Sequence, residues 1–198
     1  LISSELEMKH VDWQSPLPPL QNVTGTFKVN KGNTSLHITK ARYENQPISN
    51  VHGAINDFMT RPMVDLKVEN EVEMSLFHGT LKRIFKGHPL FDSIAVYDKF
   101  EGTAKVRLNV KGPLDDFDRL AITGRIGLNN VSLNEEGFEP RLENLNGNII
   151  YSHIPEVTKR KDAYWIPVIK YDNLSGAFSK SSFSDMNGEM GFSNGEPL

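Results

Sequence analysis

The chain has 198 residues, of which 38% are hydrophobic and 24% charged, with a formal net charge of −3 and no cysteine. This balance carries no basic field of the kind that nucleic-acid-binding proteins use. The lack of cysteine excludes disulfide bonds, cysteine-ligated metals and a cysteine nucleophile. No run approaches the roughly 18 consecutive apolar residues of a membrane-spanning helix. The chain starts without methionine and shows no signal-peptide pattern, so we expect it to be a fragment of a longer protein.

Alternation of apolar and polar residues dominates the first third of the chain. The pattern occupies residues 23–29, 36–38, 51–55 and 64–68, and a less regular version covers residues 6–11. A period of two is typical of half-buried antiparallel strands, which bury one face and hydrate the other. The alternation assigns Phe27, Val29, Ile55 and Leu66 to apolar faces, and places His52 on the solvated side.

Residues 75–86 break this period. Ser75 can cap the start of a helix and Gly87 can end it. The spacing predicts one short amphipathic helix, whose apolar residues are Leu76, Phe77, Leu81, Ile84 and Phe85. Two roles remain open for it: it covers the sheet and fills a core, or it lies along the rim of the sheet and gates it.

Alternation returns in the second half. Residues 104–111 place four apolar side chains opposite three cations, and a turn is predicted at residues 112–116. Further strands are predicted at residues 122–129, 145–151 and 164–171. Pro167 in the last of these suggests a bulge or a sheet edge.

The sequence repeats itself. Residues 20–25 (LQNVTG) match residues 142–147 (LENLNG), and residues 49–53 (SNVHG) match residues 184–188 (SDMNG). The two members of the second pair are separated by more residues than those of the first pair. This difference indicates an insertion, which we place mostly in the charged loop 157–162. We interpret residues 1–70 as the end of one repeat, residues 71–100 as a helix-containing connector, and residues 101–198 as most of the next repeat.

The order of motifs from residue 102 to residue 147 resembles the AsmA-like proteins of the Gram-negative envelope. It consists of a strand ending in Gly112-Pro113-Leu114, a strand with an internal Gly124, and the strand 142–147 described above. The resemblance covers roughly residues 20–198. It implies a repeating β-groove that carries phospholipid acyl chains across the periplasm between the inner and outer membranes. It also implies a parent protein anchored in the inner membrane by a segment outside this chain, with no catalytic residues and no cofactor.

These observations predict an all-β fold: a twisted antiparallel sheet curved into an open groove, with one short amphipathic helix. About eight to ten strands would be stacked at about 4.8 Å each. The groove would offer acyl chains an apolar lining, while lipid headgroups stay in water. The expected lining residues are Phe27, Val29, Ile55, Leu66, Val106, Leu108, Val110, Ile122, Ile126, Leu128 and Ile149.

The same alternation also fits a closed β-sandwich, in which each apolar face packs on a second sheet. Such a module would be a structural or adhesin-like interaction domain. Adhesin and glycan sites usually use exposed aromatic side chains on loops, and only Trp13 and Trp165 are available as tryptophans.

The sequence shows no constellation for catalysis or metal binding, so we expect neither an enzyme nor a cofactor. The histidines at 10, 37, 52, 78, 88 and 153 show no spacing that pairs them on one face as metal ligands. Asp115, Asp116 and Asp118 fit a turn better than a calcium loop. We interpret the Asn-x-Ser/Thr triplets at residues 22, 33, 130 and 173 as chance.

Overall fold

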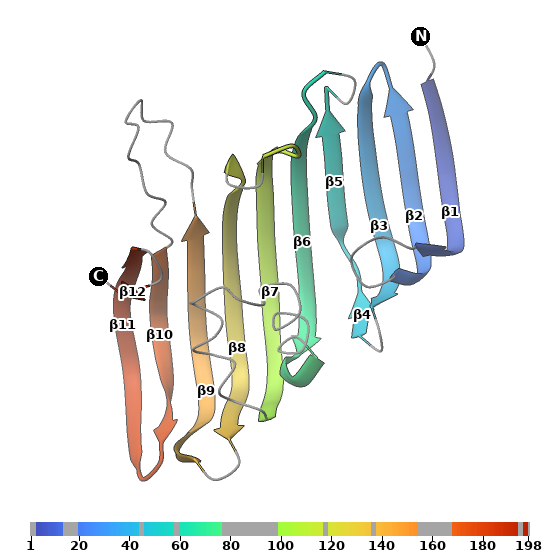
Figure 1. Cartoon of the computed structure of the whole chain (residues 1–198). Coiled ribbons are helices and arrows are strands. Elements are labelled where there is room, and N and C mark those ends of the chain that lie inside the picture. Colours follow the sequence, from blue (N-terminus) through green and yellow to red (C-terminus); the bar gives the residue numbers. More distant parts are fainter. Residues whose placement is uncertain are drawn as a thin grey trace. The chain divides into compact units, whose positions relative to one another are not determined.

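The computed structural model describes residues 3–13, 20–43, 46–57, 60–76, 99–116, 119–135, 138–153, 168–193 and 196–197. Nearly all of these residues lie in β-strands of one open antiparallel sheet (Figure 1). The predicted all-β, open-sheet fold is therefore confirmed, and no second sheet closes a sandwich within the described ranges. None of the described helical structure is long and apolar enough to cross a membrane.

Twelve strands form the sheet, more than the sequence suggested. They are β1 (Ser3–Trp13), β2 (Leu20–Asn30), β3 (Asn33–Tyr43), β4 (Gln46–Ile48), β5 (Val51–Asn56), β6 (Met63–Glu73), β7 (Lys99–Pro113), β8 (Ala121–Glu135), β9 (Phe138–His153), β10 (Val168–Phe178), β11 (Ser181–Ser193) and β12 (Glu196–Pro197). Neighbours in sequence are neighbours in the sheet, except that β4 pairs with β3 off the main path.

Every predicted strand is present where the structure describes it, and three were missed: β4, β11 and the two-residue β12. The short β4 has too few residues to show a period, and β11 alternates weakly because serine, asparagine and glycine occupy many of its positions. The turn predicted at residues 112–116 is present at residues 114–115, but its predicted start is too early, since β7 continues to Pro113. A proline fits this strand end because it has no N–H to leave unpaired.

Other predictions lie partly or wholly outside the described residues. A helical turn is present at residues 74–76, where the predicted helix begins, but its remainder at 77–86 falls in the undescribed range 77–98. The predicted insertion at 157–162 and the proline at 167 also lie outside the described residues.

The chain forms two compact units that interleave in sequence. Unit 1 contains Leu1–Asn70 and Arg107–Thr123, and unit 2 contains Glu71–Val106 and Gly124–Leu198. The strands β7 and β8 are therefore shared between the units. The repeat boundaries proposed from the sequence stay a prediction, because these units are defined by contacts in space rather than by self-similarity.

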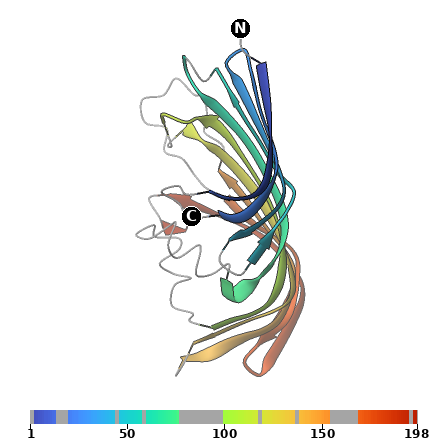
Figure 2. The ribbon, with the colours of Figure 1, turned by 90° about the vertical axis from the view of Figure 1, so that its right-hand side faces the viewer.

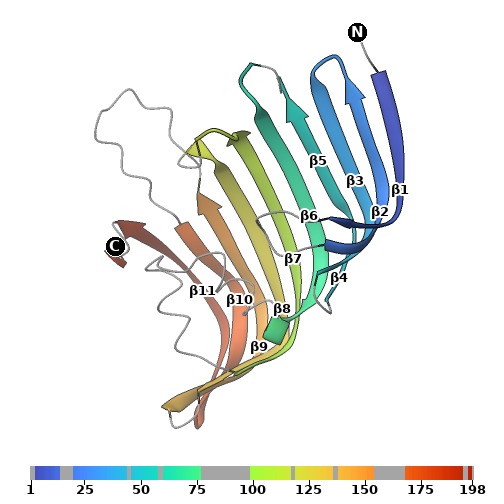
Figure 3. The same cartoon turned by 45° about the vertical axis from the view of Figure 1, so that its right-hand side comes forward.

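Individual strands in both units bend along their length (Figures 2 and 3). In five strands a residue with positive φ interrupts the extended backbone, a conformation that asparagine and aspartate tolerate better than most residues. These residues are Asn22 (φ 52°), Asn130 (52°), Asn144 (53°), Asn173 (52°) and Asp185 (53°). The pairing register shifts beside Asn22, Asn144, Asn173 and Asp185, as expected of β-bulges, which bend strands and increase their twist.

The bulges follow a short motif of asparagine or aspartate, an apolar residue, any residue, and usually glycine. It occurs at residues 22–25, 50–53, 144–147, 173–176 and 185–188. The motif explains the two sequence matches noted above. The Asn-x-Ser/Thr triplets at 22, 130 and 173 each start with a bulge residue, and their interpretation as chance stays a prediction. At three of these bulges the third residue accepts a hydrogen bond from a bulge N–H on the neighbouring strand: Ser132, Asn146 and Asn187.

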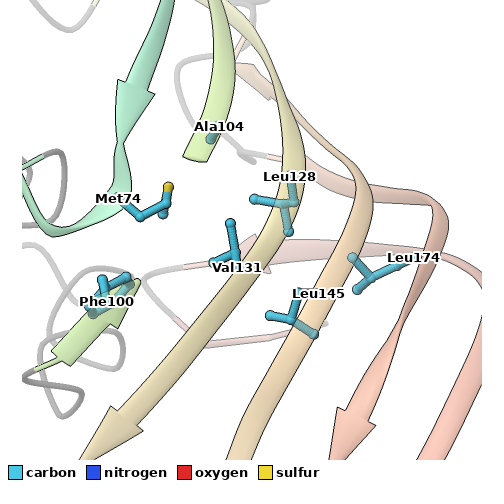
Figure 4. Close-up of a cluster of buried hydrophobic side chains, with 7 residues drawn as sticks. All are labelled: Met74, Phe100, Ala104, Leu128, Val131, Leu145 and Leu174. Atoms are coloured by element: carbon cyan, nitrogen blue, oxygen red, sulfur yellow. The ribbon is translucent and has the colours of Figure 1, made fainter. Parts of the chain in front are cut away.

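The apolar residue after four of the five bulges lies in the core, whereas Met186, which follows Asp185, is 41% exposed. Val23 is fully buried in unit 1, where it packs with Met8, Ile38, Ala41 and Val51. The buried cluster of unit 2 contains Met74, Phe100, Ala104, Leu128, Val131, Leu145 and Leu174 (Figure 4). Its Met74 comes from the helical turn, which lies on the inner side of the bent strands of this unit (Figure 2). Each core therefore lies where the strands bend.

Candidate functional site: the apolar faces of the two units

Three cross-strand rows make up the apolar face of unit 1, running from β1 to β6. The outer row is Ser4, Val29, Thr34, Ile55 and Val64; the middle row is Leu6, Phe27, Leu36, Gly53 and Leu66; the inner row is Met8, Gly25, Ile38, Val51 and Val68. All belong to one face, because side chains two apart along a strand point the same way. The predicted lining residues Phe27, Val29, Ile55 and Leu66 are thus brought together on a single face.

The middle and outer rows of this face are only partly covered. Phe27 and Leu66 are half-buried and pack against the buried cluster of the inner row. Val29 and Ile55 are half-buried in the outer row. Leu6, on the edge strand β1, is 61% exposed. The apolar surface of unit 1 therefore extends beyond its core to the edge of the sheet.

Three further predicted lining residues, Leu108, Val110 and Ile122, belong to unit 1 and are half-buried. Leu108 and Val110 alternate along β7 with Arg107 and Lys111, which form ion pairs on the opposite face. The alternation predicted for this strand is therefore present in the structure.

The apolar face of unit 2 surrounds its buried cluster. Ile126 and Ile149 are half-buried and pack against that cluster, while Val106 follows the buried Ala104 on the same side of β7. Leu128 is itself part of the core, so it offers less surface than the other predicted lining residues. Phe178 remains 46% exposed.

Tyrosines also belong to this face. Tyr171 pairs across the sheet with Ile149, and Tyr151 pairs with Ile169. Burial raises the pKa of the Tyr151 phenol above its usual value. The cause is the burial of the phenol, since removal from water disfavours the phenolate.

The opposite face of the sheet is charged in both units. Unit 1 carries ion pairs between Lys28 and Glu5 at 2.9 Å, Lys111 and Asp65 at 2.8 Å, and Arg107 and Glu69 at 3.0 Å. Unit 2 carries Arg125 with Asp172 at 3.2 Å and Lys170 with Glu189 at 2.7 Å. Exposed pairs of this kind contribute about 0–1 kcal/mol each. Their main consequence is that this face is polar, in contrast to the apolar rows on the other side of the sheet.

The charged face of unit 1 contains a feature that the sequence analysis missed. His37 and His52 are direct cross-strand partners, and their rings stack with centroids 4.2 Å apart and planes 19° apart. Two histidines therefore share a face, although the sequence showed no spacing that pairs them there as metal ligands. The pairing depends on the register between β3 and β5, which linear spacing does not reveal. His52 does lie on the solvated side and is exposed, as predicted.

These histidines line an open hollow of about 430 Å³. Its polar lining consists of Thr26, Lys28, Ser35, His37, His52, Asp65 and Lys67. Among the residues that the structure describes, no group of three or more His, Cys, Asp and Glu side chains is placed to hold a metal ion.

Comparison with protein-family models, curated proteins and solved structures gave no match for this chain. The resemblance to the AsmA-like family noted from its motifs therefore stays a prediction.

Proposed function

We propose that the apolar faces bind the acyl chains of phospholipids, and that this chain is one segment of a bridge-like lipid transporter. The observation that carries the proposal is an open sheet with one apolar face and one charged face. A soluble protein seldom leaves a contiguous apolar face in water, so an occupant is expected. Acyl chains fit a long apolar strip of this kind, with headgroups remaining in solvent.

The energetics favour passage of lipid over storage. Burying one methylene group contributes about 0.8 kcal/mol. An acyl segment of about eight methylenes, with half its surface covered, would then gain roughly 3 kcal/mol. An interaction of that size holds a chain briefly and lets it move on to the next stretch of apolar surface.

The resemblance to the AsmA-like proteins adds the cellular setting of the proposal. The parent protein would span the periplasm, be anchored in the inner membrane outside this chain, and carry phospholipid between the inner and outer membranes. The role of this segment would be non-catalytic.

The test is direct binding. The purified chain is incubated with a phospholipid that carries a fluorescent acyl chain and is then run on a native gel. We expect the fluorescence to migrate with the protein, and an unlabelled fatty acid to displace it. Water-soluble glycerophosphocholine, which has the headgroup but no acyl chain, should not compete. A folded sample that carries no fluorescence at any lipid concentration would refute the proposal and favour an interaction module.

A further inference from the structure

We propose that His37 and His52 form a binding site for a divalent transition-metal cation, of the Cu²⁺ or Zn²⁺ type, on the charged face of unit 1. The site lies on the face opposite the apolar rows, so it does not depend on lipid binding. It requires only the register between β3 and β5, in which the two histidines are partners.

The geometry supports this assignment. The ring centroids are 4.2 Å apart, and both residues line the same open hollow. Metal–nitrogen bonds of about 2.0–2.1 Å place two coordinating ring nitrogens roughly 3 Å apart. The rings need only turn out of their stacked arrangement to reach that spacing. Such a turn about the terminal side-chain torsion is easy, because this torsion has a broad energy minimum in histidine.

The chemistry of the donors selects the cation. Neutral imidazole suits copper, zinc and nickel, whereas calcium and magnesium prefer oxygen ligands. For one set of ligands the affinity order places Cu²⁺ above Ni²⁺ and Zn²⁺. Two protein nitrogens leave the remaining coordination positions to water.

Asp65 gives the hollow a further group that suits a hydrated cation. Its Oδ2 atom pairs with Lys111 at 2.8 Å, while its Oδ1 atom is buried without a hydrogen-bond partner in the structure. Asp65 also lies close to His52 in the sheet, since its cross-strand partner Ala54 is two residues along β5. A water bound to the metal would supply the missing donor, as is common for carboxylates around metal sites.

Lys67 is the cross-strand partner of His52 and lines the same hollow. Its charge opposes a cation but would attract an anion such as phosphate. The side chain is exposed, so it can turn away into solvent when a cation binds. Replacing Lys67 therefore distinguishes the two kinds of ligand, because it should weaken the binding of an anion but not of a cation.

The experiment titrates the purified chain with Cu²⁺ and Zn²⁺ by calorimetry and records the electron paramagnetic resonance spectrum of the copper form. We expect one site per chain, Cu²⁺ tighter than Zn²⁺, and two equatorial nitrogens. His52→Gln should weaken binding about tenfold or more. The matched control His153→Gln, which changes a histidine of unit 2, should leave the affinity unchanged.

Lys67→Ala completes the design. This variant should bind the metal as tightly as the original chain or more tightly. Calorimetric titration with inorganic phosphate should show no binding to the original chain or to the variant. The proposal is overturned if the folded variant carrying both His37→Gln and His52→Gln binds Cu²⁺ as tightly as the original chain. It is also overturned if the original chain binds phosphate but not metal, and Lys67→Ala abolishes that phosphate binding.

Discussion

The backbone N–H of Asn130 donates a hydrogen bond to Oδ1 of Asn146 on the neighbouring strand, at 3.0 Å. The relationship is reciprocal, because the N–H of Asn144 donates to Oγ of Ser132 at 3.3 Å. Asn173 and Asn187 repeat it at 2.9 Å. A bulge turns its N–H out of the regular ladder, and a side chain two residues past the opposing bulge accepts it. The bends of unit 2 are thus held by the same motif that creates them.

Replacing Asn146 by alanine tests this contact. We expect a loss of about 1 kcal/mol in the free energy of unfolding, since the bond is exposed and water can replace the acceptor. The amide of Asn130 should exchange its hydrogen faster. In the control Asn129→Ala, which removes the amide that donates to Thr103 Oγ1 at 3.3 Å, the exchange rate at Asn130 should be unchanged. Equal exchange at Asn130 in both variants would contradict this role for Asn146.

Gly147→Ala should unfold unit 2 or destabilise it by more than about 3 kcal/mol. Gly147 has φ 127°, and an added Cβ would clash with the backbone oxygen of Asn173. Gly32 is the matched control, since it also has positive φ (85°) but has no atom within 4 Å of the added Cβ. Gly32→Ala should lower the free energy of unfolding by about 1 kcal/mol, because only the strain of the backbone conformation is added. Thermal melts of both variants measure the difference, and similar melting temperatures would show that close packing at Gly147 is unimportant.

Charge on the apolar face should block lipid binding. In Leu108→Asp the carboxylate stays partly hydrated, because the residue is half-buried on an open face, so we expect a cost of about 1–2 kcal/mol. Ile126→Asp should cost more, about 3 kcal/mol, since Ile126 packs against the buried cluster. An acyl chain cannot pass a carboxylate without desolvating it, so both variants should lose the fluorescent lipid.

Arg107→Gln is the outward control for these two changes. It removes the exposed ion pair with Glu69 and should leave lipid binding intact. Stable aspartate variants that still bind lipid would show that the ligand uses another surface. Complete unfolding of Leu108→Asp would indicate that this face is closed.

The burial of Tyr151 predicts that the stability of the fold depends on pH in the alkaline range. Burial raises the pKa of this phenol above its ordinary value of 10.0. The unfolded chain therefore releases the proton at lower pH than the folded chain does. The resulting stabilisation is fully present below about pH 10 and is lost as the pH rises through the higher folded pKa. In Tyr151→Phe the free energy of unfolding should therefore fall less at alkaline pH. Urea unfolding of both proteins across the range from about pH 9 to 12 measures the difference. An identical pH profile for both proteins would refute it.

The sequence by itself determined the strands and their faces. Side chains alternate along any extended backbone, so the alternation in residues 104–111 assigns Leu108 and Arg107 to opposite faces without knowledge of their neighbours. The same reasoning placed eleven residues on the apolar side; ten of them are half-buried in the structure and Leu128 is in the core, and their role as a lipid lining stays a prediction. A position next to a bend is buried more deeply than its alternation suggests.

Only the tertiary structure decided which residues meet across strands. Register depends on the lengths of the turns and on where the bulges fall, and a shift of one residue exchanges the two faces. For this reason the stacked pair of His37 and His52 could not be read from their separation in the chain. The repeated asparagine motif is visible in the sequence. That its asparagines adopt positive φ and form bulges is known only from the backbone of the structure. Local alternation is a property of one strand, whereas register, bends and buried clusters are properties of several strands packed together.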